Sequence, residues 1–140
     1  MDKSSEWGPK YWYVLHMIAF NYPLTPNKVT KKKYYETIMN FPLFLPNSEM
    51  GNKFSRLLDK YPVTPYLDSR PSFIKWTHFI HNRVNELLDK PKYDYALFIE
   101  EYTKPKDERK KPLDGWLKKN KNKMVFILLL IIIGVVYRLL

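Results

Sequence analysis

The sequence predicts an all-α protein in which a four-helix bundle and a short fifth helix are followed by a C-terminal transmembrane helix. Three observations lead to this fold class. Apolar residues recur every three to four positions along each long segment between prolines, which is the spacing of one helix face. No segment shows the strict apolar–polar alternation of a half-buried strand. An uncharged and mostly apolar run, residues 124–137, lies near the end of the chain.

Length and composition narrow the class further. The 140 residues allow one domain plus an appendage. The absence of cysteine excludes disulfides, thiolate catalysis, cysteine-ligated zinc and iron–sulfur clusters, and no other metal site is predicted. The formal net charge is +10, but residues 1–102 hold 14 Lys/Arg against 11 Asp/Glu, whereas residues 103–140 hold 10 against 3. The positive charge is therefore concentrated in the tail.

Prolines mark most helix boundaries in residues 1–102, the predicted bundle domain. The first helix opens at Trp7-Gly8-Pro9, because the missing N–H of a proline costs little in a first helical turn, and it ends before Pro23. A polar cap, Asn47-Ser48-Glu49, begins the third helix, which stops before Pro62. The second, fourth and fifth helices are predicted over residues 28–41, 72–88 and 93–102.

The fourth predicted helix combines an apolar face with a polar strip. At 100° per residue the apolar face contains Phe73, Trp76, Ile80, Val84 and Leu87, and the strip beside it contains His78, His81, Asn82 and Asn85. These imidazoles and carboxamides are interpreted in two ways. They are polar groups that pair with each other at the edge of a core, or they line a site for a flat heteroaromatic ligand such as a nucleotide or flavin.

The tail is predicted to consist of a basic, proline-containing linker over residues 103–123 and an apolar anchor over residues 124–140. The four lysines directly before the apolar run favour contact with an anionic cytoplasmic leaflet over a buried core helix. The sequence therefore predicts a single-pass membrane protein with a cytoplasm-facing N-terminal domain. Nucleic-acid binding by the linker is the weaker alternative, because lysines beside an apolar segment need no such ligand.

Two motifs make the chain resemble the Erv/ALR flavin-linked sulfhydryl oxidases, especially the short forms of large DNA viruses. The first is W-G-P-x-x-W-x-x-L-H over residues 7–16, and the second is H-N-x-V-N over residues 81–85. The resemblance implies a bundle that cradles FAD. It also implies a set of flavin-contacting residues, all present here: Gly8, Trp12, His16, Tyr22, His81, Asn82, Val84 and Asn85.

The resemblance also implies a C-x-x-C redox pair at the start of the third helix, and this pair is missing. The corresponding residues are Asn47-Ser48-Glu49-Met50. Neither a carboxamide nor a thioether can replace a thiolate that attacks a disulfide or a flavin, so Asn47 and Met50 form a degenerate redox site and no catalytic residue is predicted. FAD remains a possible cofactor, although Leu87 replaces a cation expected near its phosphates.

The function predicted from these features is that of a redox-inactive Erv/ALR-like pseudoenzyme with a structural or interaction role. We expect a minor virion component that links the inner membrane and capsid of a large DNA virus, or one located in the host endoplasmic reticulum membrane. Its predicted partners are the membrane through residues 124–140, capsid or other virion proteins, and a second copy in a homodimer, with nucleic acid not expected. The alternative is an FAD-dependent, thiol oxidase-like flavoprotein that acts with a cysteine-bearing partner.

Overall fold

The computed structural model describes residues 4–105, 120–123, 125–127, 131 and 138. Helices account for all the regular structure in these residues. Those of the bundle are α1 (Ser4–Phe20), α2 (Lys28–Asn40), η1 (Phe41–Phe44), α3 (Ser48–Lys60), η2 (Thr64–Tyr66), α4 (Arg70–Leu87) and α5 (Tyr95–Thr103). The predicted all-α class is confirmed for the described residues, and each predicted helix of the bundle is present with ends shifted by at most a few residues.

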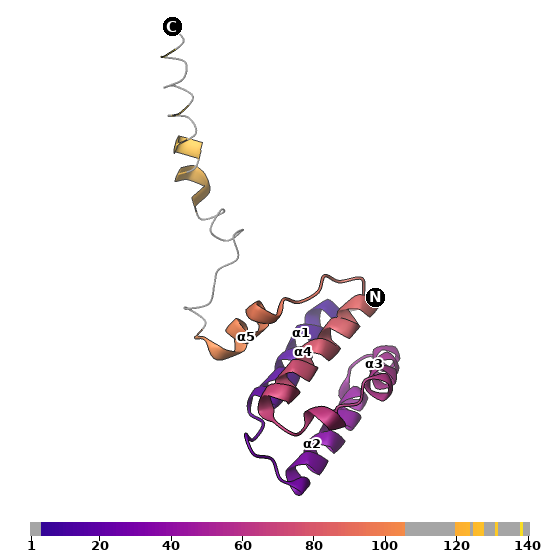
Figure 1. Cartoon of the computed structure of the whole chain (residues 1–140). Coiled ribbons are helices and arrows are strands. Elements are labelled where there is room, and N and C mark those ends of the chain that lie inside the picture. The colour runs from indigo at the N-terminus through magenta and orange to yellow at the C-terminus, as the bar shows by residue number, and fades with distance from the viewer. Residues whose placement is uncertain (1–3, 106–119, 124, 128–130, 132–137, 139–140) are drawn as a thin grey trace. The chain divides into compact units, whose positions relative to one another are not determined.

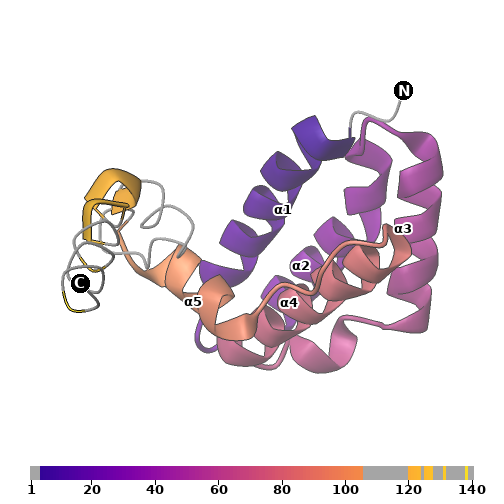
Figure 2. The same cartoon turned by 90° about the horizontal axis from the view of Figure 1, so that it is seen from above.

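The first four α-helices surround a shared core. α1 packs along α4, and the 3-10 helix η1 connects α2 to α3 while contacting both (Figure 1). Seen from above, α5 lies at the edge of the bundle next to α1 (Figure 2). The long segment before α5 therefore brings residues from the end of the domain back to the α1–α4 pair.

Large aromatic side chains fill the core. Phe73, Trp76 and Ile80 of α4 are buried, as is Phe98, the residue that fixes α5 to the bundle. Burying a side chain of this size contributes about 1.5–3 kcal/mol relative to leaving it exposed. Leu87 was predicted on the same apolar face of α4, but it lies in the last turn and is 52% exposed.

Short polar side chains begin three of the helices, and one of these caps, that of α3, was predicted from the sequence. The Oδ1 atom of Asn27 accepts a hydrogen bond from the Thr30 N–H at the start of α2, and the Oγ atom of Ser69 accepts one from the Ser72 N–H at the start of α4. Asn47 caps α3 in the same way. Each cap satisfies a backbone donor that has no partner inside the helix.

The predicted single-pass membrane localisation is wrong. The chain divides into two compact units, Met1–Thr103 and Lys104–Leu140, and within the described residues of both no helix is long and apolar enough to span a bilayer. The physical reason is length: a helix needs about 20 apolar residues to cross the roughly 30 Å hydrocarbon core, and no described helix supplies them. The rest of the predicted linker and anchor, residues 106–119, 124, 128–130, 132–137 and 139–140, lies outside the described residues.

Candidate functional site

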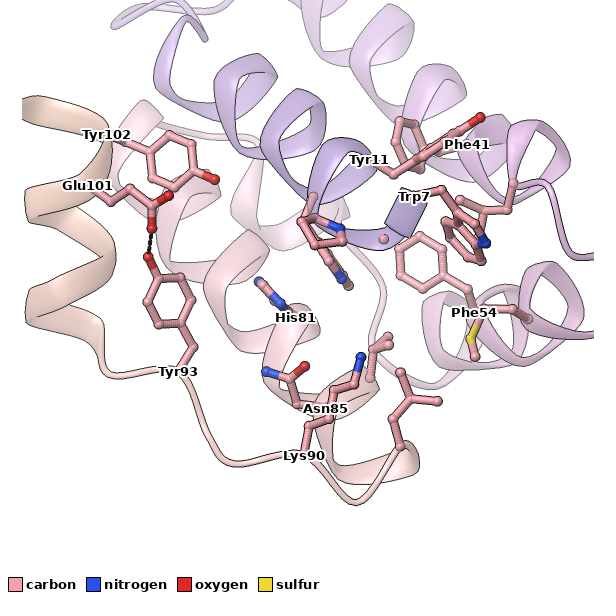
Figure 3. A pocket seen from close by; sticks show the side chains of 17 residues that line it. Trp7, Tyr11, Phe41, Phe54, His81, Asn85, Lys90, Tyr93, Glu101 and Tyr102 are labelled. Carbon is pink, nitrogen blue, oxygen red and sulfur yellow. Dashed lines mark hydrogen bonds between the residues drawn. The ribbon is translucent and has the colours of Figure 1, made fainter. Parts of the chain in front are cut away.

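A cavity of ≈ 310 Å³ lies within the bundle, between α1, α3, α4 and α5. Trp7 and Phe54 line one side of it, His81 and Asn85 lie between the sides, and Tyr93 and Tyr102 line the other (Figure 3). The volume is at the lower end of the range for small-molecule sites, and the lining is mostly aromatic and aliphatic with a few polar groups. The cavity is therefore the candidate ligand site of the domain.

A pair of stacked rings forms the central wall of the cavity. The indole of Trp12 on α1 and the imidazole of His81 on α4 are nearly parallel, with 4.0 Å between their centroids and an interplanar angle of 9°. This distance leaves no room for a third ring between them. Phe54 of α3 contacts the Trp12 ring edge to face. A planar ligand would therefore stack on the exposed side of this wall, where aromatic surfaces pack favourably.

Behind this wall, His81 is hydrogen-bonded to a second, completely buried imidazole. The Nδ1 atom of His81 lies 3.0 Å from the Nε2 atom of His16. Burial is the main cause that lowers the pKa of His16 to about 2 and the pKa of His81 to about 4, and charge interactions with the neighbouring imidazoles, and with Lys90 for His81, act in the same direction. Both rings are therefore neutral at neutral pH, and only one of the two facing nitrogens carries the proton.

Two of the predicted polar residues on α4 hold the chain that leads to α5. Asn82 donates its Nδ2–H to the Tyr93 carbonyl at 3.1 Å and accepts the Tyr93 N–H at 2.7 Å. His78 donates its Nε2–H to the same carbonyl at 2.7 Å, because a carbonyl oxygen can only accept. These bonds fix Tyr93, whose ring lines the cavity. Asn82 therefore positions a wall of the site and does not line it.

The degenerate redox position lies at the edge of the same cavity. Asn47 caps α3, its Oδ1 atom accepting the Met50 N–H at 2.9 Å, and the Met50 side chain lines the cavity. The next residue, Gly51, is buried where an added Cβ would lie 2.7 Å from the Pro42 carbonyl oxygen. The start of α3 is thus held close to η1, with Met50 directed towards the cavity.

Charged groups lie on two sides of the cavity. Lys90 lines it at the end of the turn that follows α4, and Glu101 of α5 lines it from the opposite side, accepting a hydrogen bond from the Tyr93 hydroxyl. Asp89 reaches this turn with a φ of 50°, which glycine adopts more readily than other residues. Glu86 pairs with Arg83 and Lys92. Lys90 is therefore a cation at the cavity that the sequence reasoning, which considered position 87, did not weigh.

The structure brings together five of the eight residues predicted to contact a flavin. Gly8, Trp12, His81, Val84 and Asn85 line the cavity. Three others do not line it: His16 lies behind His81, Asn82 holds Tyr93, and Tyr22 is buried with its hydroxyl donating to the Leu67 carbonyl at 2.7 Å. Sequence reasoning missed the part of the lining that comes from residues 90–102, for which a run of aromatic residues next to a lysine was the available signal.

Residues 9–104 match the Erv1/Alr family model. The chain belongs to this family. The matched residues include nearly all of α1 to α5, so the predicted resemblance to this family is confirmed.

Relatives within the Erv1/Alr family include viral proteins. The chain is 33% identical over 112 residues to a probable FAD-linked sulfhydryl oxidase of Acanthamoeba polyphaga mimivirus, covering 79% of this chain and 78% of the relative. It is 36% identical over 84 residues to an FAD-linked sulfhydryl oxidase of African swine fever virus, covering 60% and 69%. Among solved structures, the FAD-binding domain of Erv1 from Saccharomyces cerevisiae matches with a TM-score of 0.65 and 24% identity, over 73% of this chain and 95% of that one.

The residues around the cavity fit the ring system of a flavin. The Trp12–His81 wall offers a flat surface, and the Nε2 atom of His81 has no hydrogen-bond partner among the described residues although the residue lines the cavity. Asn85 adds a carboxamide and Lys90 a positive charge that suits a phosphate. FAD is accordingly a possible cofactor of this Erv1/Alr protein.

Proposed function

We propose that this Erv1/Alr protein binds a flavin in its cavity but does not oxidise thiols through its own residues, and that it acts as a binding module. The observation that carries the proposal is the identity of the residues at the start of α3. Asn47 caps the helix and Met50 reaches the cavity, at the position where the resemblance to the family places two thiols.

The side chains at the start of α3 explain why we expect no thiol oxidation. Dithiol oxidation requires a thiolate that attacks a disulfide or a flavin and then leaves through exchange. The Asn47 amide is engaged with the backbone of α3 and is no nucleophile, and the Met50 thioether has no proton to lose and accepts hydrogen bonds only weakly. The chain contains no other sulfur that could replace a thiolate, since it has no cysteine.

The other cavity residues would each hold a different part of a bound flavin. A bound flavin would supply two-electron redox chemistry. Trp12 and His81 provide the surface on which its rings stack, Asn85 provides hydrogen bonds, and Lys90 provides charge for a phosphate. Tyr93 and Tyr102 cover the side of the cavity nearest α5 and reduce the access of water.

The test uses the purified full chain. We expect a visible flavin absorbance that survives gel filtration and is released on denaturation. In a reaction with dithiothreitol, the same sample should consume oxygen no faster than an equal concentration of free FAD. A colourless protein that also fails to bind added FAD would refute the flavin part of the proposal. Oxygen consumption above the free-FAD control would refute the redox-inactive part.

A second candidate function is a flavoprotein that receives electrons from a cysteine-bearing partner. The observation in its favour is that Leu43 and Phe44, just before the degenerate redox site, are 78% and 68% exposed. Two apolar side chains at this place suit a protein contact. Under anaerobic conditions, reduced thioredoxin should then bleach the absorbance of the bound flavin, and Phe44→Ser should slow the bleaching. Absorbance that does not change with thioredoxin would remove this candidate.

Association with other copies and with virion proteins forms part of the proposal. On α1, Tyr13 and Val14 are 54% and 50% exposed and support a homodimer, which static light scattering of the full chain would test. The viral origin of two relatives supports capsid or other virion proteins as partners. Cross-linking in purified virions, followed by mass spectrometry, would test that assignment.

A further inference from the structure

The hydrogen bond between His16 and His81 can place its single proton in two ways. Either the Nε2–H of His16 donates to the Nδ1 atom of His81, or the Nδ1–H of His81 donates to the Nε2 atom of His16. The choice decides what His81 offers to the cavity. In the first arrangement its outer nitrogen, Nε2, is an N–H donor, and in the second it is an acceptor.

The surroundings of His16 favour the first arrangement. The ring of His16 is completely buried, with Phe98 and Tyr102 packed against it at centroid distances of 4.7 and 5.2 Å. Its Nδ1 atom has no hydrogen-bond partner among the described residues. If the proton were on His81 Nδ1, His16 Nδ1 would have to carry a buried N–H without an acceptor. Buried N–H groups without a partner are rarer in native proteins than under-satisfied acceptors.

His81 itself cannot reorient freely. Its ring is stacked on Trp12 at 4.0 Å and 9° and meets the Tyr93 ring edge to face at 5.7 Å. His78, the third imidazole on this side, is already committed to the Tyr93 carbonyl. The direction of the His81 outer nitrogen is therefore set by packing, and its protonation by the partner behind it.

We propose that His16 is a positioning residue that fixes the tautomer of His81, so that the cavity presents a permanent N–H donor at the edge of the Trp12–His81 wall. The inference deepens the proposed flavin site, because it selects flat ligands that carry an acceptor, a ring nitrogen or a carbonyl oxygen, at that edge. His16 acts only through His81, since it does not line the cavity.

The first test needs no ligand. The full chain is labelled with ¹⁵N-histidine, and the shared proton is assigned at pH 7 by its one-bond splitting to nitrogen. We expect the proton on His16 Nε2 and an unprotonated Nδ1 on His81. A proton on His81 Nδ1 would overturn the inference. This measurement stands whether or not the protein binds a flavin, so the failure of the proposed function and the failure of this inference are distinguishable.

The second test compares two substitutions at His16 by titration with FAD. His16→Gln keeps an amide N–H within reach of His81 Nδ1, whereas His16→Phe keeps the aromatic packing and loses the donor. Losing one hydrogen bond of ordinary strength should weaken FAD binding by about three- to tenfold in His16→Phe, with little change in His16→Gln. Equal weakening in both variants would show that His16 acts only through packing and would overturn the proposal. If His16→Phe does not fold, the proton assignment in the unaltered chain and in His16→Gln still decides the question.

Discussion

The two regions that meet at the cavity match the family pattern to different extents. On the α1–α4 side, the family-motif residues Trp12, His81 and His16 are all present, with Trp12 stacked on His81 and the buried His16 behind it. At the start of α3, the expected thiol pair is replaced by Asn47 and Met50, yet the helix begins normally. The difference shows that the start of α3 needs only a side-chain acceptor at position 47 for the Met50 N–H, which an amide supplies, whereas thiol oxidation requires sulfur.

The largest expected effect is a loss of folding stability at acid pH, caused by the two buried imidazoles on the α1–α4 side. The folded protein holds the pKa of His81 near 4 and the pKa of His16 near 2, chiefly through burial, against 6.5 in the unfolded chain. Below pH 6.5 the unfolded chain therefore binds more protons, so stability falls as the pH drops from 6.5 towards 4. For His81 alone the loss by pH 4 is on the order of 3 kcal/mol.

Urea unfolding at a series of pH values would measure this loss. The variant His81→Phe keeps a ring against Trp12 but removes the titration of His81, so its urea midpoint should fall less steeply over the same pH range. A midpoint for the unaltered chain that stays constant from pH 7 to pH 4.5 would contradict the burial of these two imidazoles as neutral groups.

The next effect tests how tightly the start of α3 is held. Gly51→Ala should destabilise the protein by about 2 kcal/mol, because the new Cβ would meet the Pro42 carbonyl oxygen at 2.7 Å. Gly8→Ala is the matched control on α1, where an added Cβ has no neighbour within 4 Å and alanine is the better helix former. Thermal unfolding of both variants gives the comparison. Equal melting temperatures would show that α3 can move away from η1 without cost.

A smaller effect isolates the cap that replaced the thiol. Asn47→Ala should cost about 1 kcal/mol, because the Met50 N–H loses its acceptor. Asn27→Ala removes the same kind of cap from α2, away from the cavity, and should cost about as much. Chemical denaturation of the two variants compares them directly. A loss for Asn47→Ala several times that of Asn27→Ala would mean that the amide does more than cap α3.

The smallest effect lies in the turn that carries Lys90. Asp89 has a φ of 50°, so Asp89→Gly should relieve strain and raise stability by about 0.5 kcal/mol. Arg56→Gly, at an exposed position inside α3, should instead destabilise the protein by about 0.8 kcal/mol, because glycine is a much poorer helix former than arginine. Differential scanning calorimetry would detect both signs. A destabilised Asp89→Gly would show that the Asp89 side chain has a role in the turn.

Much of the fold was predictable because helix signals are local. Prolines, the polar cap at Asn47 and the spacing of apolar residues placed α1 to α4, and the motif residues Trp12 and His81 do meet in the cavity. The roles of single polar residues were not predictable, since they depend on distant partners. Asn82 points at the backbone of Tyr93, eleven residues further along the chain, and not at the cavity.

The position of the cation at the cavity and the membrane anchor were also not predicted correctly from the sequence. Leu87 occupies the position where the family resemblance predicts a cation, yet the turn at Asp89 brings Lys90 to the cavity instead. The membrane prediction is wrong, since no described helix is long and apolar enough to span a bilayer. The place of the cation depends on three-dimensional reach, which residue types along the chain do not record.

The central claim is that this protein keeps a flavin cavity and lacks only the sulfur beside it. The most direct test is oxygen consumption with dithiothreitol by the double variant Asn47→Cys/Met50→Cys, compared with the unaltered chain and with Met50→Cys alone, each loaded with FAD. We predict that only the double variant consumes oxygen faster than free FAD. A double variant that binds flavin and stays inactive, or an unaltered chain that is equally active, would contradict the claim.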